Sequence, residues 1–210
     1  VDEAERRRGF FSINAMWKNK IAVLAGDFLM SKGLLLALDN DQFQLLKAMS
    51  VAVRDMSEGE LLQLDKARKL DVTEEVYFEI INGKTASLLA ASCRAGALSV
   101  SDDSEKIEAM WQFGQKMGMA FQIKDDLLDY GDATGKPKWG DLKEKKLTLP
   151  LIYALDQSTR TERRKILRMV KRKNKMQAEM ENLVGYIRDK GGMEYARNKM
   201  LTFKNEALMV

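Results

Sequence analysis

The sequence has no histidine, a single cysteine and only two prolines among its 210 residues. Without histidine and with Cys93 alone, the chain lacks the nitrogen and sulfur ligands of zinc and copper sites and any partner for an intrachain disulfide. A lone cysteine among small apolar residues is typical of core packing in a reducing compartment. Because proline interrupts helices and strands, its scarcity predicts long helices and an all-α fold.

Long apolar runs and a one-sided charge are also missing. We find no uninterrupted run of about 18 apolar residues and no signal-peptide pattern at Val1, so we expect a soluble, cytoplasmic protein. The net charge of +4 is too small to indicate a nucleic-acid partner. The segment 160–175 is an exception, with nine basic residues and one acid, Glu162. Its pattern predicts an exposed helix face, with contact to an anionic membrane as a weaker alternative.

Three carboxylates lie within five positions of the apolar segment 121–130, as Asp125, Asp126 and Asp129. At 100° per residue a helix places all three, with Gln122, in a sector of roughly a quarter turn. Such close carboxylates repel each other unless a cation neutralises them. The all-oxygen ligand set favours Mg²⁺. For an isolated Asp-Asp-x-x-Asp, however, a solvated helix face is the commoner interpretation.

Two glycines, Gly114 and Gly118, continue the same helix face at four-residue steps. One interpretation is a close crossing with another helix, which small residues permit. The other is an open groove in which a long, slim ligand lies beside the carboxylates. The sequence favours neither interpretation.

Lys84 lies in a predicted helix that is otherwise rich in Ala, Ser and Gly. A charge in such a closely packed helix needs a partner, and an anion is the natural one. The sequence Gly83-Lys84-Thr85 resembles the end of a phosphate-binding P-loop, but the first glycine of that motif is absent and no strand precedes it. We therefore reject a nucleotide loop.

Basic residues follow the carboxylates and also open the chain. Residues 130–150 contain three glycines and five lysines, including Lys136 and Lys146, which predicts a flexible basic loop over the acidic face. This separation of charges indicates a ligand that carries both metal and phosphate. Near the start, Arg7 and Arg8 precede Gly9, a pattern that fits either an exposed basic cluster or a phosphate clamp.

Together these motifs resemble the all-trans polyprenyl diphosphate synthases. The segment from Phe121-Gln122 to Thr148-Leu149-Pro150, with the carboxylates, Gly135-Lys136 and Lys146 between, is similar to the second aspartate-rich motif of that family and its trailing loop. Other blocks of the family are matched by Lys84-Thr85, by Gly59-Glu60 with Gln63, and by Gly26-Asp27-Phe28-Leu29. Asp2 is in register with the last aspartate of the first aspartate-rich motif. We therefore expect the natural polypeptide to extend beyond this sequence at both ends.

The resemblance implies a single-domain helical bundle of the isoprenoid (terpenoid) synthase type over residues 1–210, built around a central cavity and forming a homodimer. It implies Mg²⁺-dependent condensation of isopentenyl diphosphate with an allylic diphosphate such as farnesyl or geranylgeranyl diphosphate. The product would be a longer all-trans polyprenyl diphosphate, and the similarity favours medium- and long-chain members such as octaprenyl diphosphate synthase.

The resemblance also implies a role for each motif residue. The metal ligands would be Asp2, Asp125, Asp126 and Asp129. The departing diphosphate would be bound by Lys84, Lys136 and Lys146, and the diphosphate of the second substrate by Arg7 and Arg8. Positive charge on the prenyl carbons would be stabilised by the side-chain oxygens of Thr85 and Gln122.

Two other functions fit the same motifs. A non-catalytic subunit of a heteromeric synthase would keep the fold and the dimer surface without the first aspartate motif. A terpene cyclase would share the helical fold and the diphosphate chemistry. We rank the cyclase lower because cyclases generally lack a second aspartate triad followed by a lysine-rich loop.

Overall fold

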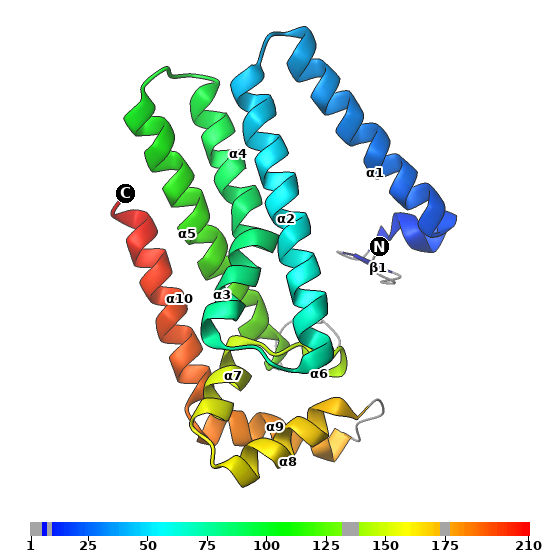
Figure 1. Ribbon diagram of the computed structural model, residues 1–210, viewed down its shortest axis with the longest axis vertical. Coiled ribbons are helices and arrows are strands. Elements are labelled where there is room, and N and C mark those ends of the chain that lie inside the picture. The colour runs from blue at the N-terminus through cyan, green and yellow to red at the C-terminus, as the bar shows by residue number, and fades with distance from the viewer. Residues whose placement is uncertain (1–5, 8–9, 132–138, 173–176) are drawn as a thin grey trace. The chain divides into compact units, whose positions relative to one another are not determined.

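The computed structural model describes residues 6–7, 10–131, 139–172 and 177–210, and for residues 6, 7, 13, 14 and 18 the backbone alone. The chain divides into two compact units, Val1–Lys47 and Ala48–Val210, which we describe separately. Helices dominate both units, as predicted (Figure 1). The single-domain organisation stays a prediction.

The first unit begins with a short strand pair. Strand β1 (Arg6–Arg7) runs antiparallel to β2 (Phe10–Phe11), and this pair is the one departure from an all-α fold among the described residues. Helix α1 (Ile13–Asp39) follows directly. The hydroxyl of Ser12 accepts a hydrogen bond from the Ala15 amide at 3.0 Å, which satisfies one of the free N–H groups at the start of the helix.

Helix α1 contains a long apolar segment. Within its segment Asn19–Asp39, a window of 18 residues has a mean hydropathy of 1.8, and none of that window is buried. Asp27 and Lys32 interrupt the apolar run, as the sequence showed, and the segment is still long and apolar enough to cross a membrane by length and composition. A core helix of a soluble protein has the same length and composition, so this property alone does not indicate a membrane protein.

Two long helices, α2 (Phe43–Lys69) and α5 (Ser104–Asp129), belong largely to the larger unit, and three consecutive helical segments connect them in sequence. Helix α2, which starts within the first unit, leads to α3 (Glu74–Ile81), and the π-helical turn η1 (Asn82–Ala86) joins α3 to α4 (Ser87–Leu98). Helix α5 then packs along η1 and α4.

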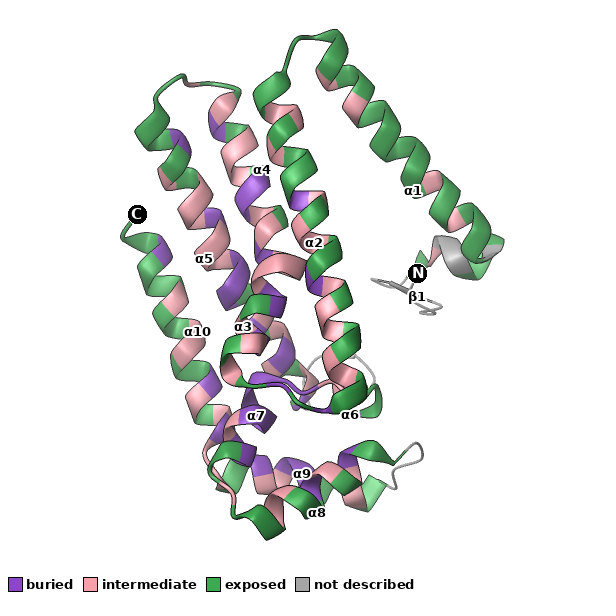
Figure 2. Cartoon of the chain, viewed as in Figure 1, coloured by how far each residue is buried: buried purple, intermediate pink, exposed green. Residues whose placement is uncertain are grey.

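Further helices follow among the described residues of the larger unit (Figure 1). They are α6 (Gly140–Lys143), α7 (Leu149–Asp156), α8 (Arg160–Lys171), α9 (Gln177–Asp189) and α10 (Gly192–Leu208). Most of α7 is buried, and it contacts α5, α8, α9 and α10. Figure 2 shows buried positions along the inner sides of α4, α5, α7 and α9. The hydrophobic core thus supports the C-terminal half of α5, where the carboxylates lie.

The crossing of α5 with η1 and α4 is close enough to require glycine. A Cβ atom on Gly114 would lie 2.6 Å from the carbonyl oxygen of Leu89, and one on Gly118 would lie 2.5 Å from the Cα atom of Ala86. Backbone occupies the space beside both glycines, so the close crossing is confirmed and the open-groove interpretation was wrong. The crossing brings the 118–126 face of α5 against η1.

We expect Gly118→Ala to lower the free energy of unfolding by about 1–3 kcal/mol, because the added methyl group overpacks a backbone contact. The matched control is Gly96→Ala in α4, where a Cβ atom would meet nothing within 4 Å. This control should be neutral or stabilising by up to about 1 kcal/mol, since alanine favours helix interiors. Urea unfolding followed by circular dichroism measures both values, and equal effects at the two sites would contradict the close crossing.

Candidate active site

Asp126 is the centre of the site and its side chain has 0% exposure. Its Oδ2 atom accepts a hydrogen bond from the Tyr77 hydroxyl at 2.8 Å. Its Oδ1 atom accepts from Gln122 Nε2 at 2.9 Å and from Lys146 Nζ at 3.2 Å. Protein donors from three segments hold both oxygens, so the Asp126 side chain is fully buried, whereas Asp125 and Asp129 in the same sector of α5 are only half-buried.

Lys146 supplies the positive charge beside this buried carboxylate. Burial raises the pKa of Asp126, and the charge of Lys146 is the largest influence that lowers it. Burial also opposes the charge on Lys146, but Asp126 and Asp141, each 3.2 Å away, outweigh it and raise the pKa of the ammonium group above its ordinary value. The charge of Lys146 is therefore engaged by two carboxylates of the chain itself.

Asp129 and Asp125 are both half-buried, and they lie about one helical turn apart on α5. The Oδ1 atom of Asp129 accepts from the Gly140 amide at 2.8 Å, and its Oδ2 atom accepts from the Asp141 amide at 3.1 Å. Burial, followed by the nearby charge of Asp141, raises the pKa of Asp129. This carboxylate thus anchors the start of α6 to the end of α5.

Lys84 has the anionic partner that its surroundings predicted, although the partner is a side chain of α2. Its Nζ atom lies 2.5 Å from Glu60 Oε2 and 3.3 Å from Gln63 Oε1. The lysine side chain is 39% exposed, so other anions can also reach it. The π-helical turn brings its backbone against α2, where a Cβ atom on Gly59 would lie 2.7 Å from the Lys84 amide nitrogen. Such turns are frequent at functional sites.

Thr85 and Gln122 lie side by side, as expected if both side-chain oxygens act on the same substrate carbons. The Thr85 hydroxyl donates to Gln122 Oε1 at 2.8 Å, and the amide nitrogen of the same glutamine donates to Asp126. The two contacts fix the orientation of the glutamine amide, because its oxygen accepts and its nitrogen donates. A connected chain of hydrogen bonds therefore runs from Thr85 on η1 through α5 to Tyr77 and Lys146.

Four predicted site residues are not placed by the structure. Asp2, Arg8 and Lys136 lie outside the described residues, and Arg7 is described by its backbone in β1 alone. Their assigned roles stay predictions.

Two residues at the site did not stand out in the sequence by their chemistry. Tyr77 is 49 positions away from Asp126, and a tyrosine in an amphipathic helix is ordinary, so nothing marked its role. Glu60 was noticed only as part of a family block. The signal that it faces Lys84 was its spacing of three from Gln63, which puts both side chains on one face of a helix.

The donor set fits a hard cation such as Mg²⁺ in part. No group of three or more acidic, cysteine or histidine side chains converges on a metal position within the described ranges. Mg²⁺ commonly binds through one or two carboxylates, with water and substrate phosphates as its other ligands. The half-buried Asp125 and Asp129 offer two such carboxylates, whereas Asp126 is fully buried among protein donors.

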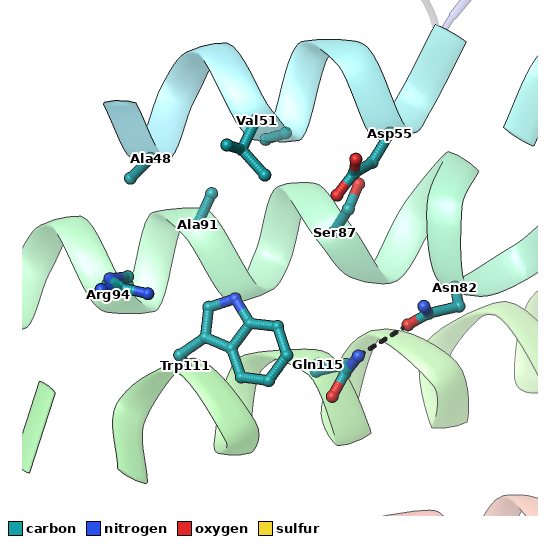
Figure 3. Close-up of a pocket in the computed structure, with 10 residues that line it drawn as sticks. Ala48, Val51, Asp55, Asn82, Ser87, Ala91, Arg94, Trp111 and Gln115 are labelled. Carbon is teal, nitrogen blue, oxygen red and sulfur yellow. Dashed lines mark hydrogen bonds between the residues drawn. The ribbon is translucent and has the colours of Figure 1, made fainter. Parts of the chain in front are cut away.

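A separate cavity of about 110 Å³ lies between α2, α4 and α5, and none of the predicted site residues lines it. Figure 3 shows Asp55 and Ser87 close together on facing helices, and Arg94 and Trp111 farther along the cavity. Asn82 accepts a hydrogen bond from Gln115 Nε2 at 3.0 Å across its edge. The chemistry predicted from the sequence is therefore centred on Asp126 and not on this cavity.

Comparison with known proteins gives consistent matches. The family model described as polyprenyl synthetase matches residues 1–187. The all-trans-nonaprenyl-diphosphate synthase (geranyl-diphosphate specific) of Rhodobacter capsulatus is 37% identical over 99% of this chain and 64% of that protein. This chain therefore spans somewhat less than two thirds of that relative.

Solved structures give the same result for the fold. The decaprenyl diphosphate synthase of Rhodobacter capsulatus superposes with a TM-score of 0.90 at 32% identity, covering 98% of this chain and 64% of that one. The polyprenyl synthase of Caulobacter crescentus, solved with calcium and isoprenyl diphosphate, gives a TM-score of 0.87 at 34% identity, covering 97% of this chain and 63% of that one. The predicted all-α fold is confirmed.

We expect Lys146→Met to lower the free energy of unfolding by about 3–5 kcal/mol at neutral pH, because it leaves a buried carboxylate without its cation. The matched control is Lys143→Met, an exposed position three residues earlier, which should change stability by less than about 0.5 kcal/mol. Urea unfolding of both variants measures the difference.

The stability lost in Lys146→Met should increase as pH rises. Removing Lys146 raises the pKa of folded Asp126 further above its ordinary value of 3.8. A carboxyl group whose folded pKa is raised binds protons preferentially in the folded state, so the variant loses stability as pH rises above 3.8 and recovers it as pH falls. An equal deficit at weakly acidic and neutral pH would contradict the pairing.

Proposed function

Because the chain belongs to the polyprenyl synthetase family, we propose that the protein is a prenyltransferase. It condenses isopentenyl diphosphate with an allylic diphosphate and so lengthens an all-trans polyprenyl diphosphate. The observation that carries this proposal is the hydrogen-bonded chain Thr85–Gln122–Asp126–Lys146 on the family's motif residues, with Lys84 adjacent to Thr85. The nonaprenyl and decaprenyl synthases among the similar proteins support a medium- or long-chain product.

Neutralisation of the leaving diphosphate is the first requirement of this reaction. Mg²⁺, when bound, would supply part of that positive charge. Asp125 and Asp129 would hold the cation, with Asp2 as a further ligand from the first unit's sequence. Lys84 would exchange its contact with Glu60 for a diphosphate oxygen, since it is partly exposed and already paired with an anion. Lys136 would bind the same diphosphate.

Lys146 has a more specific role in this proposal. Its ammonium group lies between Asp126 and Asp141, so a direct contact with diphosphate requires it to give up one of these carboxylates. We propose that its main contribution is to keep Asp126 ionised and in place. Asp126 in turn orients Gln122, and so acts as a positioning residue more than as a metal ligand.

Charge stabilisation at carbon is the second requirement. As the allylic C–O bond breaks, positive charge develops on the prenyl carbons, and the oxygens of Thr85 and Gln122 would stabilise it. Their mutual hydrogen bond holds these dipoles in place before the reaction. The double bond of isopentenyl diphosphate, held by Arg7 and Arg8, then forms the new C–C bond, and a proton is lost to the released diphosphate.

Incubation with farnesyl diphosphate, labelled isopentenyl diphosphate and Mg²⁺ tests the function in the protein made from its complete coding sequence. We expect labelled products longer than the primer on chromatography. Asp125→Asn should lower kcat by roughly 100-fold or more, because it removes a charge that holds the cation. The control Asp102→Asn, at an exposed position before α5, should leave kcat unchanged.

Two outcomes of this assay are decisive. The absence of chain extension by the unaltered protein would sink the prenyltransferase proposal and favour a non-catalytic subunit. Full activity of Asp125→Asn, with unchanged circular dichroism, would remove its metal role.

We further propose that the protein is a cytoplasmic homodimer in which a second copy covers the apolar surface of α1. Leu29 is 68% exposed and Leu36 is 67% exposed on this helix, and exposed apolar patches of this kind mark interfaces. Leu29→Glu combined with Leu36→Glu should convert the dimer to a monomer in sedimentation analysis. Lys20→Glu, on the opposite side of α1, is the control and should stay dimeric. A monomeric unaltered protein would contradict the proposal.

A further inference from the structure

We propose that α8 carries an electrostatic docking surface for anionic lipid bilayers. We call this surface the α8 basic face, and it consists of Arg160, Arg164, Lys165, Arg168 and Lys171. The surface itself is argued from the helix alone. Its use, which is to bring the site of synthesis to the membrane that takes up a lipophilic product, rests on the proposed prenyltransferase function.

The five cations share one side of a regular helix. At 100° per residue they fall within an arc of about 140°, and each of them is exposed. The opposite side is part of the protein core, where Ile166 and Val170 are buried and Leu167 and Met169 are partly buried against it. The apolar side of α8 is therefore not available for insertion into a bilayer, and contact by charge alone remains.

No ion pair among the described residues neutralises these five charges. Three acidic side chains within α8 or beside it pair with other cations, namely Asp156 with Arg163 at 3.1 Å, Glu162 with Lys190 at 3.2 Å, and Glu179 with Arg172. Within the described part of the chain, none of the five cations of the α8 basic face makes an ion pair. A soluble surface normally mixes both signs, so an unbalanced stripe of this length indicates an anionic partner.

The geometry favours a planar anionic surface over a nucleic acid. A straight helix of 12 residues spans roughly 18 Å and presents its cations on one side, as a flat surface requires. No aromatic side chain occurs in α8 to stack on bases. The net charge of the sequence is only +4, so attraction is confined to this face and is not spread over the chain.

The position of α8 suits delivery to a membrane. In Figure 1, α8 and α9 lie together beyond α7, at the end of the larger unit that also holds α6. Helix α8 packs on α7, which in turn contacts α5, the helix that carries the acidic residues. Docking through the α8 basic face would thus bring the end of the unit that holds the site close to the lipid headgroups.

Vesicle co-sedimentation of the protein made from its complete coding sequence tests the proposal. We expect binding to phosphatidylcholine vesicles that contain phosphatidylserine, no binding to phosphatidylcholine alone, and loss of binding at high salt. The triple variant Arg164→Gln, Lys165→Gln, Arg168→Gln should bind roughly 100-fold more weakly, since each basic residue near the surface contributes about five-fold. Because these side chains are exposed and without ion pairs, the fold should be unaffected.

The matched control removes the same number of charges from scattered exposed positions, as Arg68→Gln, Arg197→Gln, Lys204→Gln. It should bind within about three-fold of the unaltered protein. An equal loss in both variants, an unchanged triple α8 variant or equal binding to neutral vesicles would overturn the proposal. So would tighter binding to a duplex or single-stranded oligonucleotide than to anionic vesicles at the same salt.

The chain-extension assay separates this proposal from the proposed function. The triple α8 variant should keep full activity on soluble short-chain substrates, because its residues lie outside the site. Binding to anionic vesicles by a protein without any prenyltransferase activity would retain the docking surface and reject the enzyme. An active prenyltransferase that does not bind anionic vesicles would retain the proposed function and reject the docking surface.

Discussion

The buried ion pair between Asp126 and Lys146 is the interaction on which the site depends. A charged carboxylate with no exposure is costly unless cations and hydrogen bonds hold it, and here a lysine, a glutamine and a tyrosine do so. Each donor comes from a different part of the fold: Tyr77 from α3, Gln122 from α5, and Lys146 from the segment before α7. The pair therefore fixes these segments against one another as well as fixing the side chains.

Close backbone contacts set the geometry that this pair then maintains. Gly118 lets α5 approach Ala86, and Gly59 lets α2 approach the backbone of Lys84. Both contacts converge on η1, the π-helical turn that presents Lys84 and Thr85. The widened turn and the glycines act together, because a larger residue at either crossing would move these two side chains away from their partners.

Sequence patterns predicted the helical fold, the acidic segment and the anionic environment of Lys84, since each depends on periodicity or on local composition. They did not predict that Asp126 turns inward, because a residue 100° from Asp125 lies at the border between core and solvent until its neighbours are known. Tyr77 was missed because its contact joins residues 49 apart. The Gly114 and Gly118 pair was ambiguous for the same reason, as the nature of the facing helix decides between crossing and groove.

Asp129 links cation binding at the acidic residues of α5 to the anchoring of α6. Its two carboxylate oxygens accept the first amide groups of α6, so the four-residue helix begins on a side chain that also belongs to the acidic face. Any cation that takes an oxygen of Asp129 competes with those amides for the same lone pairs. By thermodynamic reciprocity, loading the acidic face and loosening the α6 anchor must then influence each other to the same extent. The carboxylate proposed to hold the cation is thus also the one that anchors the start of α6.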